Sequence, residues 1–325
     1  MKTLVTGGAG YIGSHAVREL LEAGHQVAVL DDLSQGHRAA VPKGVRLIQA
    51  DLAEAGGDVL AGVDAVLHFA GVLSVAESMR DPSRYYRTNV VKGLALLDAM
   101  LAAGVRRLVF SSTCAVYGLP VRIPMDEDHP REPINPYGAT KHAFERALGD
   151  HARAGRLRAV ALRYFNAAGA HPDGSLGEDH VPEEHLIPLA FDAALGRRPE
   201  LTIHGDDYDT PDGTCIRDYI HVQDLARAHV QALTLLDEGE PFRAFNLGSE
   251  RGHSVREVVE TVARVTGKKV STRVGPRRPG DPPRLVASAA RIREATGYRP
   301  VHDTIEAIVE TAHRWRRDHP QGYRG

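Results

Sequence analysis

A glycine-rich turn directly after a short apolar segment is the feature that most restricts how this chain can fold. Residues 7–13 read GGAGYIG, follow the buried-strand pattern of residues 3–6 and lead into apolar positions at helical spacing. Glycines at positions 7, 10 and 13 permit a tight turn and let backbone N–H groups approach a diphosphate at the positive end of the helix. The sequence therefore predicts a strand–turn–helix unit that binds a dinucleotide.

Strand and helix patterns then alternate along the first half of the chain, as they do in doubly wound α/β proteins. The strands are short, continuous apolar runs, which suits a parallel sheet covered by helices on both faces. Helical segments at about 83–103 and 137–154 precede the fifth and sixth strands. After the N-terminal strand we predict strands at Gln26–Leu30, Val45–Gln49, Ala65–Phe69, Leu108–Ser111 and Ala159–Phe165.

The composition of the sequence changes after about Ala170, where loops rich in proline, glycine and acidic residues begin. The later segments Ile216–His221 and Ala244–Leu247 have strand patterns, and we expect them to rejoin the main sheet. We therefore predict a Rossmann domain over residues 1–170 and a smaller, interleaved α/β domain over residues 171–325. Strands near 216–247 are expected to return to the first domain.

The composition excludes several classes of protein. Forty basic and 42 acidic residues give a formal net charge of −2, so no overall basic field indicates nucleic-acid binding. No apolar run approaches the roughly 20 residues of a membrane span, and the glycine turn begins too early for a cleavable signal. Cys114 and Cys215 cannot form a disulfide framework or a metal site by themselves. We expect a cytoplasmic protein with no membrane or nucleic-acid partner and no metal site.

Two acidic residues end the second predicted strand and indicate which dinucleotide is bound. Asp31 and Asp32 lie 18 and 19 residues after Gly13. A carboxylate at this position accepts hydrogen bonds from ribose hydroxyls and repels a 2′-phosphate. The pattern therefore favours NAD over NADP, although Arg38 is a nearby cation that offers the 2′-phosphate a partner.

Tyr137 and Lys141 lie four residues apart, on one face of the helix predicted at 137–154. A free tyrosine has a pKa near 10, so a phenolate at neutral pH requires that this pKa fall by about 3. The lysine ammonium and the positive nicotinamide ring of an oxidised cofactor supply charge of the required sign. The hydroxyl residues at 111–113 follow the fifth strand at the same carboxyl edge, where a hydroxyl bridges a sugar oxygen and the phenol. The pattern predicts a proton-transfer site.

The motifs resemble those of the extended short-chain dehydrogenase/reductase family, and within it those of the nucleotide-sugar 4-epimerases. The resemblance spans the whole chain. The N-terminal motifs specify only the superfamily, whereas the segment around Thr210–Val222 and the terminal HPQGY at 319–323 are much closer to the epimerases. The matching stretches are 7–13, 31–34, 68–71, 85–90, 110–113, 116–118, 135–141, 162–166, 205–214, 217–222, 245–248 and 319–323.

The resemblance implies an isomerase that inverts C4 of a UDP-hexose, converting UDP-galactose to UDP-glucose through a transient 4-keto sugar and tightly held NAD. Tyr137 is implied as the base that removes the 4′-hydroxyl proton, and Thr113 as the group that orients or shuttles it. Lys141 is implied to bind the nicotinamide ribose and to lower the pKa of Tyr137. The hydride that leaves C4′ returns to the other face of the sugar, so no net oxidation occurs. A homodimer formed through the helices at 83–103 and 137–154 is also implied.

The resemblance assigns two further sets of residues, one to the cofactor and one to the UDP-sugar. The cofactor set follows the ends of the predicted strands and comprises Gly7, Gly10, Tyr11, Ile12, Gly13, Asp31, Asp32, Leu33, Ser34, Gly36, Asp51, Leu52, Phe69, Ala70, Gly71, Asn89, Ser111, Tyr137, Lys141, Tyr164 and Phe165. The substrate set comprises Thr113, Tyr137, Asn166, His185, Leu186, Thr202, His204, Arg217, Arg278, Asp281 and Leu285. Taken singly, Asp51 fits a helix cap equally well, and Asn89 fits a buried amide that satisfies backbone groups.

Four positions depart from the pattern of the family. Leu73 stands where some members carry a lysine near the cofactor phosphates, which implies looser retention of NAD. His185 replaces an asparagine that contacts substrate, and His204 replaces an aromatic residue near the uracil, so their roles are open. Leu285 occupies the position whose bulk is associated with exclusion of N-acetylated sugars. Its intermediate size leaves acceptance of UDP-N-acetylglucosamine open.

Three other functions fit parts of the pattern. A nucleotide-sugar 4,6-dehydratase places Asp-Glu directly after the catalytic threonine, whereas Cys114 and Ala115 follow Thr113 here. A 4-epimerase of another UDP-sugar, such as an N-acetylhexosamine, pentose or uronate, remains open. A non-catalytic NAD-binding protein is expected to lose Tyr137 or Lys141, and both residues are present.

Overall fold

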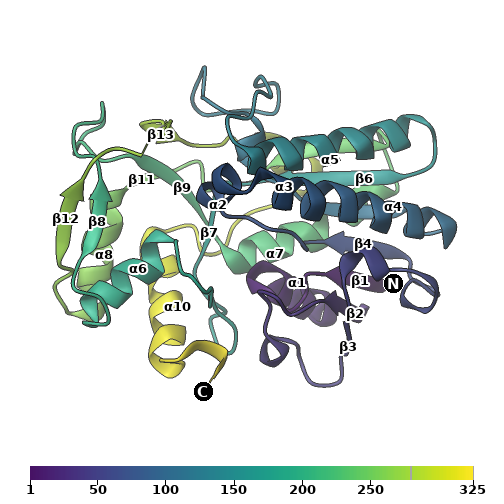
Figure 1. The fold of residues 1–325 in the computed structure, drawn as a ribbon, viewed down its shortest axis with the longest axis horizontal. Coiled ribbons are helices and arrows are strands. Elements are labelled where there is room, and N and C mark those ends of the chain that lie inside the picture. The colour runs from purple at the N-terminus through teal and green to yellow at the C-terminus, as the bar shows by residue number, and fades with distance from the viewer. Residues whose placement is uncertain (279, 325) are drawn as a thin grey trace.

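A seven-stranded parallel sheet forms the centre of the protein, and this computed structural model describes residues 1–278 and 280–324. The strand order is β10-β6-β5-β4-β1-β2-β3, so the chain starts in the middle and winds outward in both directions (Figure 1). The predicted doubly wound parallel sheet is confirmed. Its strands are β1 (Lys2–Thr6), β2 (Gln26–Asp31), β3 (Arg46–Gln49), β4 (Ala65–His68), β5 (Arg107–Ser111), β6 (Arg158–Arg163) and β10 (Phe242–Asn246).

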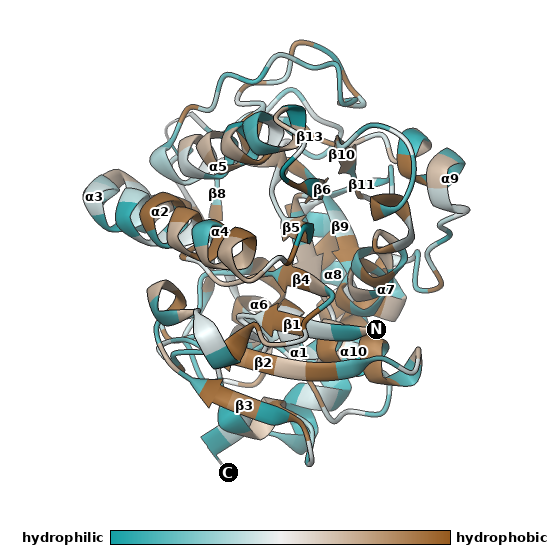
Figure 2. Cartoon of the chain, turned by 90° about the vertical axis from the view of Figure 1, so that its right-hand side faces the viewer, coloured by the Kyte–Doolittle hydropathy of each residue, from teal (hydrophilic) through white to brown (hydrophobic). Residues whose placement is uncertain are grey.

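Helices cover both faces of this sheet because alternate side chains of each strand point to opposite faces. In β1, Leu4 belongs to the apolar cluster under α4 (Lys92–Ala102) and α5 (Pro136–Arg153), whereas Val5 belongs to the cluster under α1 (Tyr11–Glu22) and α7 (Val222–Gln231). The strands are accordingly apolar along much of their length (Figure 2). Among the residues that the structure describes, no helix combines the length and the apolar character that crossing a lipid bilayer requires.

The second half of the chain builds a smaller part beside the sheet (Figure 1). One small sheet has β9 at its centre, and another pairs β8 with β12. Helices α6, α8 and α10 pack together through an apolar core that includes Phe191, Val258 and Ile308. The elements are β7 (Asn166–Ala168), α6 (Leu186–Ala194), β8 (Leu201–His204), β9 (Ile216–His221), β11 (Gly252–Ser254), α8 (Val255–Thr266), β12 (Thr272–Gly275), β13 (Arg284–Leu285) and α10 (Ile305–Asp318). Helix α9 (Ala290–Thr296) packs instead against β10 of the main sheet.

Two expectations need correction. Of the late segments expected to rejoin the main sheet, β10 does so beside β6, but β9 does not, because its edges pair with β7, β11 and β13 instead. The predicted helix at 83–103 is divided into α3 (Pro82–Tyr85), a wider π-helical turn (Tyr86–Val91) and α4, and it is preceded by α2 (Val75–Arg80). The domain boundary near residue 170 stays a prediction.

A buried ion pair fastens α5 to the sheet. Glu145 and Arg163 are only 2% and 1% exposed, and Arg163 Nε donates to Glu145 Oε1 at 2.9 Å. Ser112 Oγ donates to the same carboxylate, while Arg163 Nη1 donates to the Tyr117 hydroxyl at 2.8 Å. That hydroxyl in turn donates to Asn246 Oδ1 at 2.6 Å. The network therefore joins α5, β6, β10 and the loop after β5.

We predict that Glu145→Ala lowers the free energy of unfolding by about 3–5 kcal/mol, because it leaves the buried Arg163 guanidinium without its counter-charge. Urea unfolding followed by circular dichroism measures this loss. The matched control is Asp150→Ala, which removes an ion pair with Arg153 whose two side chains are largely exposed on the same helix, and we expect a loss below about 1 kcal/mol. Equal losses in the two variants would contradict the structural role of the buried pair.

Candidate active site

The glycine turn has the shape that a diphosphate requires. Gly7 has a φ of +72°, and a Cβ there would lie 2.5 Å from the Ala70 nitrogen. A Cβ on Gly13 would lie 2.1 Å from the Gly7 carbonyl oxygen, so the turn and the helix approach each other too closely for any side chain. Helix α1 begins at Tyr11, and its N-cap residue Gly10 offers no side-chain acceptor. The first N–H groups of α1 are therefore left for an anionic ligand.

The carboxylate at the end of β2 is built into this turn. Asp31 is buried, and its two oxygens accept hydrogen bonds from Ala9 N and Leu33 N, each at 2.9 Å. Burial raises the pKa of Asp31, and these two hydrogen bonds oppose that rise. Asp32 is exposed and accepts from Ser34 N at 2.9 Å. The alternative phosphate partner, Arg38, donates to Gln49 Oε1 at 2.8 Å instead.

The predicted cofactor residues after β3 and β4 also have structural partners. Asp51 accepts from Ala53 N at 2.9 Å as the N-cap of the short turn Leu52–Glu54, so its interpretation as a cap is confirmed. It also pairs with Lys92. Phe69 N and Ala70 N donate to Thr6 O, which places this segment against the glycine turn. Contacts of Asp51, Leu52, Phe69 and Ala70 with a cofactor stay predictions.

Asn89 lies in the π-helical turn and is 5% exposed. Its Oδ1 accepts from Val72 N at 2.9 Å, and its Nδ2 donates to Val72 O and Thr140 Oγ1, both at 3.1 Å. The interpretation of Asn89 as a buried amide that satisfies backbone groups is therefore confirmed. A Cβ at Gly71 would lie 2.8 Å from Asn89 Oδ1, so the two residues fit only with glycine at position 71. This contact fixes the segment that follows β4.

The predicted catalytic residues meet at the carboxyl edge of β5. Helix α5 starts at Pro136, with Asn135 Oδ1 accepting from Gly138 N at 2.8 Å, so Tyr137 lies in the first turn. One turn later, Lys141 is 5% exposed and donates to Ser111 O at 3.0 Å. Its Nζ lies 4.8 Å from the centroid of the Phe110 ring. The hydroxyls of Ser111 and Tyr164 are 2.6 Å apart.

In the protein without its cofactor, burial determines the direction in which the pKa values of Lys141 and Tyr137 shift. It lowers the pKa of Lys141 to about 8 and raises that of Tyr137 to about 12, with a hydrogen bond to Thr113 opposing the rise. Lowering of the pKa of Tyr137 by Lys141 together with an oxidised cofactor stays a prediction. Burial, and then the charge of Lys141, lower the pKa of His68 to about 3, so His68 is neutral and adds no positive charge.

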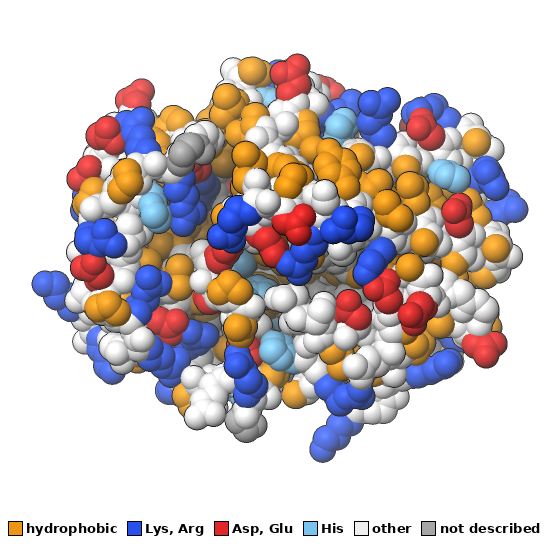
Figure 3. All heavy atoms as spheres, in the orientation of Figure 1, with side chains coloured by type: hydrophobic (Ala, Val, Ile, Leu, Met, Phe, Trp, Pro, Cys, Tyr) orange, Lys and Arg blue, Asp and Glu red, His pale blue; other side chains and the backbone are white. Residues whose placement is uncertain are grey.

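Of the predicted substrate residues, Arg278 and Asp281 line a groove on the surface of the protein. Arg217 Nη2 pairs with Asp281, and Leu285 of β13 pairs in register with Arg217 of β9. Asn166 Nδ2 donates to Asp218 O at 3.0 Å on the same small sheet. Lys and Arg side chains gather around a hollow on the face shown in Figure 3. The groove has a volume of about 740 Å³ and is lined by Leu119, Pro120, Ile123, Asp209, Arg277, Arg278 and residues 280–284.

The remaining substrate residues lie on or next to two further elements, β8 and α6. Thr202 and His204 belong to β8, where His204 Nδ1 is 3.4 Å from Pro276 O. Leu186 begins α6, whereas His185 directs its Nδ1 toward Glu178 and Glu183 instead of the guanidinium groups. Leu73 is 48% exposed and offers no charge to a phosphate.

Sequence reasoning missed two groups of polar residues. Glu145 follows Lys141 by one further helical turn, so extending the four-residue spacing from Tyr137 would have identified it. One residue outside these two groups also differs from its assignment. Phe165 was assigned to the cofactor, and the structure packs it against the apolar cluster of Cys114, Val116, Tyr117, Met125 and Ala287. The second group that sequence reasoning missed is Glu178, His180 and Glu183, whose side chains lie close to that of His185.

Comparisons with known proteins agree with this geometry. Residues 3–248 match the NAD dependent epimerase/dehydratase family. A UDP-glucose 4-epimerase of Azospirillum brasilense is 53% identical over 97% of this chain and 92% of its own length. The structure of the Brucella ovis UDP-glucose 4-epimerase in complex with NAD superimposes with a TM-score of 0.92 at 47% identity, covering 97% of this chain and 98% of that one.

A second solved structure carries both kinds of ligand. The Bifidobacterium longum UDP-glucose 4-epimerase in complex with NAD+ and UDP has a TM-score of 0.92 at 35% identity, and the match covers 99% of this chain and 100% of that one. The family match covers well over half of the chain, and the relatives match it nearly end to end. The chain therefore belongs to the NAD-dependent epimerase/dehydratase family.

Proposed function

We propose that this protein is an NAD-dependent 4-epimerase that interconverts UDP-galactose and UDP-glucose. The observation that carries the proposal is the convergence of Tyr137, Lys141 and Thr113 at the carboxyl edge of β5, between the glycine turn and the groove that holds Arg278 and Asp281. An acid–base group beside a dinucleotide site and a cationic groove is the arrangement that oxidation of a nucleotide sugar requires.

Each catalytic side chain has a distinct task in the proposed reaction. Tyr137 accepts the proton of the 4′-hydroxyl as C4′ is oxidised, and it returns a proton when C4′ is reduced. Thr113, whose hydroxyl opposes the rise in the pKa of Tyr137, orients the sugar oxygen toward the phenol. Lys141 holds the nicotinamide ribose and contributes positive charge beside the phenol. When bound, NAD accepts the hydride from C4′, adds the cation that stabilises the phenolate, and gives the hydride back.

Inversion requires that the protein hold the nucleotide more firmly than the sugar. Arg217 and Arg278 offer two guanidinium groups to the diphosphate, and guanidinium binds phosphate oxygens through paired hydrogen bonds. The sugar then turns about its link to the diphosphate and presents its other face. This division of binding strength allows one base and one cofactor to serve both faces of C4′.

We also propose that the enzyme acts as a cytoplasmic homodimer that associates through α4, α5 and the helical turns before α4. Two apolar side chains of this region face solvent in the single chain, since Val91 is 60% exposed and Tyr86 is 45% exposed. Leu97 is fully buried in the chain's own core, and Leu94 and Leu101 pack against that core. The exposed pair, and not the leucine stripe, therefore supports association.

We expect the purified protein to convert UDP-galactose to UDP-glucose without stoichiometric NADH, and Tyr137→Phe to lower kcat by ~10²–10⁴ because the base is lost. Exposed Tyr86→Phe is the matched control and should keep normal turnover. Sugar deuterated at C4′ should yield product that retains its label. Near-normal turnover by Tyr137→Phe, or product without the label, would refute the assigned mechanism.

Lys141→Met should stabilise the NAD-free protein at pH 7 by about 1–3 kcal/mol, because the folded state no longer carries a buried ammonium. The pKa of Lys141 is about 8 in the folded protein and 10.5 in the unfolded chain. Between these values the unfolded chain binds more protons, so wild-type stability rises with pH and the advantage of Lys141→Met shrinks above pH 8. Thermal unfolding of NAD-free protein at pH 7 and pH 10 measures both effects.

The same substitution should weaken retention of NAD, which is measured as nucleotide released on gel filtration. Lys43→Met serves as the control, since Lys43 is exposed, and we expect a stability change within about 0.5 kcal/mol. A Lys141→Met protein that is less stable than wild type without NAD at pH 7 would show that burial of the ammonium is not costly here.

Sedimentation velocity should give a mass of about 71 kDa for the proposed dimer, twice the 35.3 kDa of one chain. Val91→Asp introduces a charge into the proposed contact and should shift the protein toward the monomer mass. Val301→Asp is the control, because Val301 is 64% exposed outside this region. A wild-type protein that sediments as one 35.3 kDa species at micromolar concentration would contradict the proposal.

A further inference from the structure

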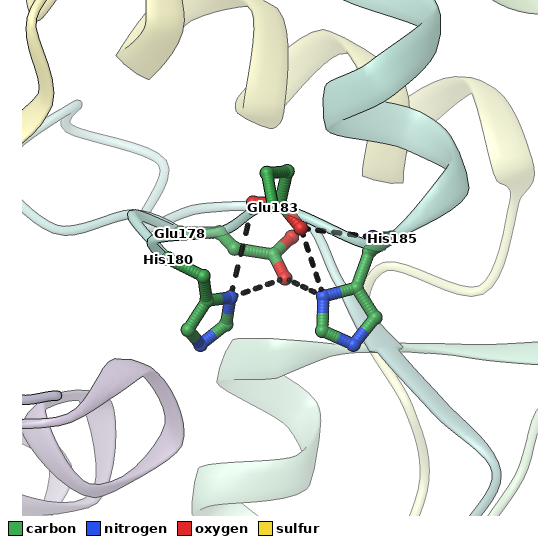
Figure 4. A group of neighbouring side chains, drawn as sticks. All are labelled: Glu178, His180, Glu183 and His185. Atoms are coloured by element: carbon green, nitrogen blue, oxygen red, sulfur yellow. Dashed lines mark hydrogen bonds and ion pairs between the residues drawn. The ribbon is translucent and has the colours of Figure 1, made fainter. Parts of the chain in front are cut away.

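Four potential metal ligands gather in the segment that leads into α6. Glu178, His180, Glu183 and His185 each direct one oxygen or nitrogen toward a common point, and these ligand atoms all lie within 4.8 Å of one another (Figure 4). Glu178 is 6% exposed, and the other three are partly buried. The two imidazole rings use their Nδ1 atoms, and the two carboxylates lie between them (Figure 4).

The distances fit one small divalent ion. Zinc binds imidazole and carboxylate at about 2.0–2.2 Å, so two ligands of a tetrahedral site lie roughly 3.3–3.6 Å apart. His180 Nδ1 lies 3.2 Å from Glu178 Oε1 and 3.8 Å from Glu183 Oε2. His185 Nδ1 lies 2.7 Å from Glu178 Oε1 and 3.1 Å from Glu183 Oε1. The four His–Glu separations lie on both sides of the tetrahedral value. The ligand atoms as a set span up to 4.8 Å, so binding of one ion would draw the widest pair closer together.

Hydrogen bonding leaves part of this cluster unsatisfied. Within the described residues, Glu178 Oε1, His180 Nδ1 and Glu183 Oε2 are buried atoms without a hydrogen-bond partner. Glu178 Oε1 lacks one even though His185 Nδ1 approaches to 2.7 Å. Both histidines form ion pairs with these carboxylates, and a shared cation would satisfy the same nitrogen and oxygen atoms in place of the imidazole protons. An unsatisfied buried carboxylate oxygen otherwise costs free energy.

The segment is held in place by contacts outside the cluster. Gly177 N donates to the Tyr323 hydroxyl at 3.0 Å, and Tyr323 N donates to Asp179 Oδ2 at 3.0 Å. A Cβ on Gly177 would lie 2.2 Å from the Trp315 ring, so α10 closes over the start of the segment. The His37 and Tyr323 rings stack with centroids 4.9 Å apart. The backbone of the proposed ligands is therefore positioned before any ion binds.

We propose that Glu178, His180, Glu183 and His185 bind one divalent transition-metal ion of the zinc class in tetrahedral geometry. Four protein ligands leave no open position, which is typical of a structural site and not of a catalytic one. The ion fixes the segment that precedes α6, next to Tyr11 of the glycine turn, whose ring lies 6.1 Å from that of His180. His185 then serves the metal through Nδ1. The inference replaces the sequence-based expectation that the chain has no metal site.

The test uses the full-length, untagged protein, stripped of metal with EDTA and free of nucleotide, titrated with CoCl2. We expect one equivalent of Co2+ to bind with micromolar or lower Kd and to produce the intense visible bands of tetrahedral cobalt. ZnCl2 should displace the cobalt and abolish those bands. No saturable binding, or only the weak bands of octahedral cobalt, would overturn the proposal.

His180→Gln and Glu183→Gln each remove one ligand and should weaken Co2+ binding at least tenfold, with loss of the tetrahedral bands. His253→Gln is the matched control, because His253 Nδ1 pairs with Glu257 at 2.8 Å in a two-residue His–Glu contact outside the cluster. Binding in this variant should equal wild type. If His180→Gln and Glu183→Gln both bind cobalt as wild type does, the four residues form hydrogen-bonded His–Glu pairs only and the metal assignment is wrong.

Discussion

The ion pair between Glu145 and Arg163 is the interaction on which the geometry of the active site depends. Glu145 lies one helical turn beyond Lys141 on α5, and Arg163 ends β6. The same carboxylate accepts from Ser112, next to Thr113. One buried contact therefore sets the distance between the helix that carries the base and the strand edge that carries the hydroxyl. A buried ion pair adds little stability compared with well-packed apolar residues at the same positions. The contribution of this pair is therefore to hold α5 and β6 in a fixed relative position.

The proton affinities of the site follow from the same burial. An apolar environment disfavours both a phenolate and an ammonium, and it therefore raises the pKa of Tyr137 and lowers that of Lys141. The chain alone holds a neutral tyrosine, which cannot act as a base. A cation beside the Tyr137 hydroxyl would favour the phenolate. The positive nicotinamide of a bound oxidised cofactor would supply such a charge, which would couple the base to the presence of the hydride acceptor.

The sequence predicted the main sheet well, because short apolar strands, a glycine turn and helical spacing are local patterns. It also brought Tyr137, Lys141 and Thr113 to one edge, since residues after parallel strands share an edge. It failed for β9, whose pairing depends on β7 and β13 from distant parts of the chain. The burial of Tyr137, which raises its pKa in the protein alone, arises from tertiary packing and has no local signal in the sequence. The position of His185 beside Glu178 and Glu183 likewise depends on how a loop folds, which residue spacing alone does not determine.

The two arginines assigned to the diphosphate differ in how freely they can approach a phosphate. Arg217 is already paired with Asp281 and is largely buried, so a diphosphate that binds Arg217 must compete with that carboxylate. Arg278 is exposed and has no such constraint on its approach to phosphate. Pre-pairing keeps the Arg217 guanidinium oriented without substrate, and orientation lowers the entropic cost of binding. In the proposed reaction these two arginines would bind the diphosphate, which would leave the sugar free to turn about its link to it.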